Sequence, residues 1–101
     1  MYARVAMYHG ADAAGIDKLL AESSKDFEAR FEEPGEGLAG IREFFLLVDR
    51  ESGRGLGIAL FDSQADLQRG EEELDRMPLS QAGGVRTGVE RYEVAWHLER
   101  T

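Results

Sequence analysis

Few side chains in this sequence have the chemistry of a catalyst. His9 and His97 are the only histidines, and histidine is the side chain whose ordinary pKa lies near neutrality. Either one could act as a general base that takes a phenolic proton, so that the resulting carbanion reacts with oxygen. The structural alternative is a histidine in solvent at a strand end or at a dimer seam, which is the commoner role of an isolated histidine.

Arg4 and Tyr8 are the other candidates for catalysis, because they alternate with Ala6 on one face of the first predicted strand. Arg4 could bind an enolate or a carboxylate, and Tyr8 could orient a phenol. The structural alternative, which we expect to be the commoner one, is that Arg4 pairs with Glu90 or Glu93 across neighbouring strands. The predicted catalytic residues are His9, Tyr8 and Arg4.

A second group of residues has the sizes expected around a ligand. Gly70 falls on the inward stripe of a predicted helix, where glycine costs about 1 kcal/mol relative to alanine. Gly57 and Ala59 remove volume from a predicted strand, so the three leave room for a ligand if they face one another. The equal alternative is that these small residues allow the helix to pack closely on the sheet. The aromatic residues Trp96 and Tyr92 could line the pocket, or they could belong to the core. The predicted ligand-binding residues are Gly57, Ala59, Phe61, Gly70 and Trp96.

Composition argues against several classes of protein. The 101 residues suit one domain over residues 1–101. Because the sequence has no cysteine and its two histidines lie far apart, we predict no metal site, and no cofactor is predicted either. The net charge of −8 and the scattered arginines argue against nucleic acid or a membrane as partner. Neither a signal peptide nor a membrane span is expected, so a cytoplasmic protein is predicted.

The pattern of apolar residues predicts six elements. Strands are expected over residues 2–9, 41–49, 56–62 and 85–99, and helices over residues 13–31 and 64–77, with a loop over residues 79–84. Asp12 and Ser63 are predicted N-caps, and Ser63 with Asp66 resembles a capping box. The β-α-β-β-α-β order predicts an α+β, ferredoxin-like fold, in which two helices cover one face of a four-stranded antiparallel sheet.

The two predicted helices are amphipathic. The apolar stripe of the first contains Ile16, Leu20, Phe27 and Phe31, with Leu19 at its edge. The stripe of the second contains Leu67, Gly70, Leu74 and Met77, and its outer side carries Gln68, Glu72, Glu73 and Asp75.

The hairpin over residues 40–62 is apolar on both faces, although helices can cover only one face of such a sheet. On its first strand Phe44 and Leu46 alternate with Phe45 and Leu47. Leaving the second face in water would exceed the few hundred Å² of contiguous apolar surface that soluble monomers tolerate. The sequence therefore predicts a homodimer that packs sheet to sheet.

The run GLGIALFDSQADLQ resembles the signature of antibiotic biosynthesis monooxygenase-like domains, in which an aromatic ends a strand before a short cap and an Ala/Leu pair in the next helix. Here these residues are Phe61, Ser63, Ala65 and Leu67. The segments MYARV, VDRESGRGL and VERYEVAWHL are similar to uncharacterised bacterial members of this group, so the resemblance covers the whole chain.

The resemblance implies a dimeric α/β barrel in which the last strand often reaches onto the partner and each subunit's ligand lies between its sheet and helices. It implies a cofactor-independent monooxygenase or isomerase acting on a small aromatic or polyketide-like compound. The alternative is a non-catalytic homodimer that binds a small apolar or aromatic molecule or serves in stress. The sequence departs from characterised members because it has no Asn, and its second helix has no His of the kind that haem-degrading relatives use.

Overall fold

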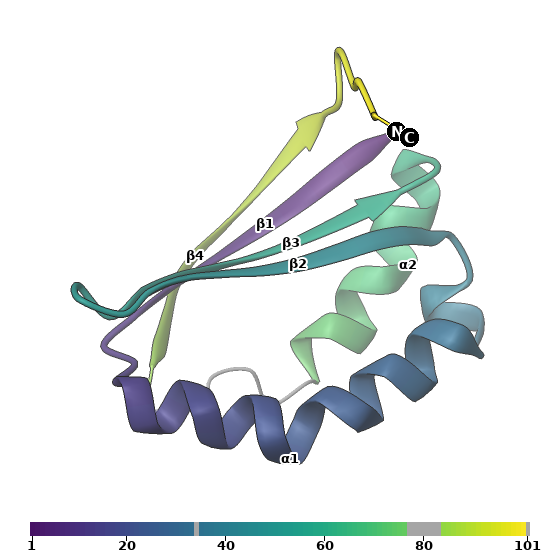
Figure 1. Ribbon diagram of the computed structural model, residues 1–101. Helices are drawn as coiled ribbons and strands as arrows, with labels where there is room; N and C mark the ends of the chain where they lie inside the picture. The colour runs from purple at the N-terminus through teal and green to yellow at the C-terminus, as the bar shows by residue number, and fades with distance from the viewer. Residues whose placement is uncertain (34, 77–83, 101) are drawn as a thin grey trace.

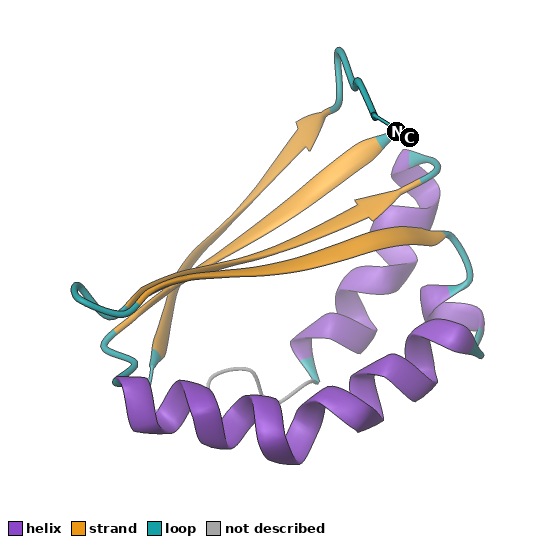
Figure 2. Cartoon of the chain, viewed as in Figure 1, coloured by secondary structure: helices purple, strands orange, loops and turns teal. Residues whose placement is uncertain are grey.

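The computed structural model describes residues 1–33, 35–76 and 84–100 (Figure 1). The strands are β1 (Tyr2–His9), β2 (Ile41–Asp49), β3 (Arg54–Phe61) and β4 (Val85–Glu93), and the helices are α1 (Ala13–Glu32), the short 3₁₀ helix η1 (Glu36–Leu38) and α2 (Gln64–Asp75). The strands form one antiparallel sheet in the order β2-β3-β1-β4. Both α1 and α2 lie on the same face of it (Figure 2), so the predicted ferredoxin-like architecture is confirmed.

The turn of the hairpin is shorter than the sequence pattern predicts, because the second strand begins two residues earlier. Gly53 has a φ of +75° and donates its N–H to the Asp49 carbonyl at 2.9 Å, while the Asp49 carboxylate accepts from the N–H groups of Glu51 and Ser52. A Cβ on Gly53 would also lie 2.8 Å from the Ala11 carbonyl oxygen, so glycine is required here. The ladder therefore resumes at Arg54, and not at the predicted residue 56.

The last strand is shorter than predicted. β4 ends at Glu93, and the Val94 N–H donates to the Met1 carbonyl at 2.9 Å. Because β1 begins at Tyr2, the protomer offers no neighbouring strand for the residues that follow. Within one protomer, the prediction that the last strand continues to residue 99 is therefore wrong.

Each helix begins at the predicted cap. The Asp12 carboxylate accepts from the Gly15 N–H at 2.6 Å, and the Ser63 hydroxyl accepts from the Asp66 N–H at 3.1 Å. In a complete capping box the Asp66 carboxylate would accept from the Ser63 N–H. Here it forms an ion pair with Arg69 instead. Among the described helices, neither α1 nor α2 has the length and hydropathy of a membrane span.

Replacing Ser63 by alanine is expected to lower the free energy of unfolding by about 1 kcal/mol, because it removes the acceptor for an N–H at the start of α2. Urea denaturation followed by circular dichroism measures this loss. Ser24→Ala is the control, since Ser24 lies inside α1, where alanine is the better helix former. An equal effect of the two substitutions would contradict the proposed contribution of the cap.

The core lies between the sheet and α2. Phe61 is fully buried, and it packs in one cluster with Leu67 and Leu74 of α2 and Leu38 of η1. The predicted stripe of α2 is confirmed over its described residues; Met77 and residues 79–83 of the predicted loop lie outside them. On α1 the structure buries Ile16 and Leu19 and leaves Leu20 43% exposed, so Leu19 and not Leu20 belongs to the buried face of the helix.

Candidate functional site

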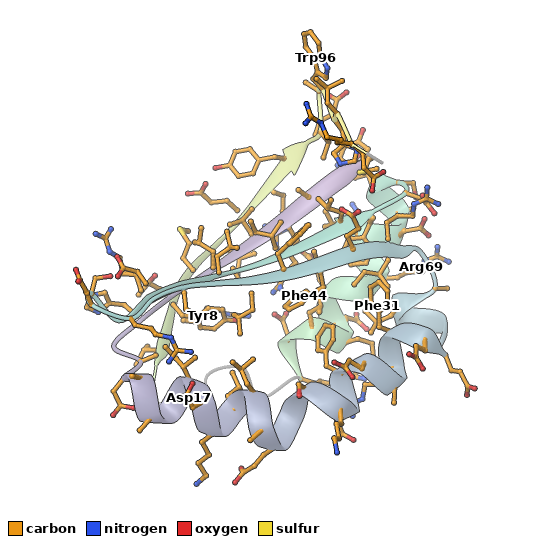
Figure 3. The ribbon with its side chains drawn as sticks, in the orientation of Figure 1. Tyr8, Asp17, Phe31, Phe44, Arg69 and Trp96 are labelled. Atoms are coloured by element: carbon orange, nitrogen blue, oxygen red, sulfur yellow. The ribbon has the colours of Figure 1, made fainter. Side chains whose placement is uncertain are left out.

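The helix-facing surface of the sheet brings two aromatic rings together over a glycine. A Cβ on Gly57 would lie 3.6 Å from Cζ of Phe44 and 3.7 Å from Cε2 of Tyr8, so both rings reach contact distance of the same backbone position. Tyr8 and Phe44 extend from the sheet toward α1 (Figure 3), and the Phe44 ring meets that of Phe27 with centroids 4.4 Å apart. Although helices cover this face, Tyr8 and Phe44 remain only partly buried.

Arg4 lies on the same face, deeply buried at 5% exposure, and its partners come from α2. Its Nη2 donates to Oδ1 of Asp75 at 2.6 Å, and its Nε lies 3.6 Å from Oε1 of Glu71. The two acids are four positions apart and therefore project from one side of the helix. The expected pairing of Arg4 with Glu90 or Glu93 is wrong, because α2 crosses this face and presents its carboxylates to the buried guanidinium.

Each of these carboxylates is shared with a second arginine from β4. Asp75 Oδ1 also accepts from Arg86 Nη1 at 2.6 Å, and Glu71 also accepts from Arg91. We name these five residues (Arg4, Glu71, Asp75, Arg86 and Arg91) the arginine–carboxylate cluster. The assignment of Asp75 to the outer side of its helix is thus wrong. Only the i, i+4 spacing of the two acids pointed to the cluster in the sequence.

Tyr8 is held as a neutral phenol. Burial raises the pKa of the Tyr8 hydroxyl above its ordinary value of 10.0; nearby Arg4 and Arg86 oppose this shift in part, and Asp75 reinforces it. At neutral pH the group is therefore a hydrogen-bond donor that can be offered to a ligand oxygen, and it is not a base.

The stability of the protein is expected to fall at alkaline pH through Tyr8. A raised folded-state pKa means that the stabilising contribution is complete below the unfolded-state pKa, about 10, and is lost as the pH rises through the higher folded-state value. The Tyr8→Phe variant should lose less stability than the wild type over that alkaline range. Urea denaturation at a series of pH values measures the difference. Equal alkaline losses of stability in wild type and Tyr8→Phe would contradict the prediction.

The structure brings together some of the predicted site residues and leaves others apart. Arg4, Tyr8, Gly57 and Ala59 share the helix-facing surface of the sheet. His9 is exposed at the end of β1, where strand alternation directs it away from the face of Tyr8, and His97 is exposed beyond β4. Trp96, predicted to bind ligand, is 81% exposed and projects beyond the sheet in Figure 3.

Gly70 lies against the core. A Cβ at this position would overlap the ring of Phe61, so the space left by the glycine is occupied by that ring. Of the two alternatives for Gly70, close packing of helix and sheet is the arrangement present. Phe61 is fully buried by the same contact.

An open groove that no sequence pattern indicated lies on the outer side of α2. Its volume is about 960 Å³. It is lined by Arg30, Gly35, Gly37, Leu38, Ala65, Gln68, Arg69, Glu72 and Glu73. The walls carry charges of both signs, two of them already paired, Arg69 with Asp66 and Glu73 with Arg76. The groove joins the end of α1, η1 and α2, so only the tertiary structure assembles it.

Neither a protein-family model nor a curated protein matches the sequence. Among solved structures, a dimeric ferredoxin-like protein from an uncultured marine organism is similar, with a TM-score of 0.65 and 16% identity over 98% of each chain. A putative antibiotic biosynthesis monooxygenase from Deinococcus radiodurans has a TM-score of 0.63 and 13% identity, over 100% of this chain and 99% of that one.

A third similar structure is a variant of MhuD with two manganese protoporphyrin IX molecules bound per active site, with a TM-score of 0.61 and 17% identity over 99% of this chain and 100% of that one. At these identities the likeness establishes the fold. The chain has the ferredoxin-like fold of antibiotic biosynthesis monooxygenase-like domains, as the resemblance of its sequence motifs implied.

Proposed function

We propose that this protein is a homodimer that binds a small apolar or aromatic compound between the sheet and α1 of each subunit. The observation that carries the proposal is the pair of partly buried rings, Tyr8 and Phe44, that both lie at contact distance from the Cβ position of Gly57. Flat aromatic molecules stack well between such rings. The neutral phenol of Tyr8 would donate a hydrogen bond to a ligand oxygen and so fix the orientation of the ligand. In apolar binding sites a few polar groups usually have this role.

The homodimer is proposed from the outer face of the sheet, opposite the helices. Phe45 and Leu47 of β2 are 45% and 48% exposed there, and Tyr92 of β4 is 52% exposed. Packing this face on its copy in a second chain would remove the apolar surface of both from water. Two of the similar structures are described as dimeric ferredoxin-like proteins, which supports the same assembly here.

A cofactor-independent oxygenase or isomerase is the second candidate, supported by the fold shared with antibiotic biosynthesis monooxygenases. Such chemistry needs a base to take a proton from the substrate. Among the described residues, Glu71 and Asp75 of α2 are each paired with two arginines, and His9 is exposed on the other side of β1. Binding without turnover is therefore the better supported function, and His9 as general base belongs to the second candidate.

Native mass spectrometry of the purified protein, followed by titration with 1-naphthol, tests the proposal. We expect the mass of a dimer and saturable binding of one 1-naphthol per subunit. Gly57→Leu should abolish binding, because the new side chain would extend from Cβ toward the rings of Tyr8 and Phe44, where the ligand is proposed to lie. Gly35→Leu is the matched control, since nothing lies within 4 Å of a Cβ at Gly35, which lines the outer groove. Binding that Gly57→Leu leaves intact would overturn the proposed site.

A further inference from the structure

We propose that the arginine–carboxylate cluster is an anion-binding subsite for the carboxylate of an acidic aromatic ligand, with Asp75 as the resident counter-ion that the ligand displaces. The inference rests on the proposed function and deepens it by naming the class of ligand. The aromatic body would lie over Gly57, and its acid group would point along β1 toward Arg4.

The first argument is an excess of positive charge around a buried arginine, Arg4. The cluster contains three guanidinium groups and two carboxylates, so sharing each acid between two arginines leaves one positive charge without its own counter-ion. Arg4 Nε is also buried, and it has no hydrogen-bond partner among the described residues. A buried N–H without an acceptor carries a desolvation penalty that an additional anion at this place would relieve.

The second argument concerns Asp75. It is the last residue of α2, where a negative charge opposes the helix dipole, so its place there depends on Arg4 and Arg86. Asp75 is also 49% exposed and Arg86 is 43% exposed, whereas Arg4 is buried at 5%. Solvent therefore reaches the acid that holds the buried arginine. A ligand carboxylate can replace it from that side, while Asp75 turns into water.

The third argument is the distance from the aromatic rings. In the sheet, Gly57 is opposite Ala6 and Ala59 is opposite Arg4, so these pairs are successive positions on the helix-facing surface. Two residues along a strand span about 7 Å, which is close to the length of a naphthalene ring with its carboxylate. Between the two places, β1 and β3 contribute only the methyl groups of Ala6 and Ala59, which are both 1% exposed.

The test compares 1-naphthoate with neutral 1-naphthamide by isothermal titration calorimetry at constant ionic strength. Because hydrogen bonds to charged groups are the strong ones, we expect naphthoate to bind about tenfold more tightly, or better. Asp75→Asn should tighten naphthoate binding and leave naphthamide unchanged, since it removes the competing charge. Arg86→Gln should weaken naphthoate binding alone, and Arg42→Gln, which removes the same charge elsewhere, should not.

The outcomes separate this inference from the proposed function. Equal binding of naphthoate and naphthamide by wild type and Asp75→Asn would overturn the anion subsite and leave the aromatic site intact. Weaker naphthoate binding by Asp75→Asn would also overturn it, because it would assign Asp75 a merely structural role. No binding of either compound to any variant would overturn both proposals.

Discussion

We expect the Phe45→Glu variant to be a monomer at concentrations where the wild type is a dimer. Phe45 lies on the outer face of β2, opposite Ile58 of β3 in the register, and is 45% exposed in one protomer. Burying such a side chain contributes about 1.5–3 kcal/mol, and a two-fold interface contains each residue twice. A carboxylate at that place would also have to leave water without a partner, which is far more costly.

Together these effects should raise the dimer dissociation constant by about two orders of magnitude or more, at about 1.4 kcal/mol for each factor of ten. Sedimentation equilibrium over a range of concentrations measures the change directly. Leu20→Glu is the matched control, because Leu20 is 43% exposed on α1, on the other side of the sheet. If Phe45→Glu and Leu20→Glu are both dimers of wild-type affinity, the outer face of the sheet is not the interface.

The second large effect is expected from Gly70→Ala, a substitution that would stabilise an ordinary helix. Alanine is favoured over glycine by about 1 kcal/mol inside a helix. Here its Cβ would overlap the ring of Phe61, which is fully buried. Overpacking of this kind costs about 1–3 kcal/mol, so we expect a net loss of stability in chemical denaturation.

A double-mutant cycle with Phe61→Leu identifies the cause of that loss. Phe61→Leu alone should destabilise the protein, because it leaves a cavity in the core. In the Phe61→Leu background, Gly70→Ala should be neutral or stabilising, since the smaller side chain makes room for the methyl group. Gly35→Ala is the control for replacing a glycine by alanine without a steric contact, because nothing lies within 4 Å of a Cβ at Gly35. Additive losses from Gly70→Ala and Phe61→Leu would show that the contact is not responsible.

Much of the fold follows from local sequence signals, because each of them acts within a few residues. Asp12 and Ser63 cap the helices that they were predicted to cap, since a capping side chain needs only the N–H groups three residues ahead. The two apolar strands around Gly53 identify the hairpin for the same reason. The β-α-β-β-α-β order then restricts the sheet to very few arrangements.

What the sequence determined by itself was the set of elements and the fact that both faces of the hairpin are apolar. Which face meets the helices was decided only in three dimensions, because Phe61 and Ala59 must pack on Leu67 and Leu74 of α2. The same packing places α2 across β1 and so brings Asp75 to Arg4. The two residues are 71 positions apart in the sequence, and no local pattern relates residues at that separation. It leaves Phe45 and Leu47 on the outer face, where a second chain is proposed to cover them.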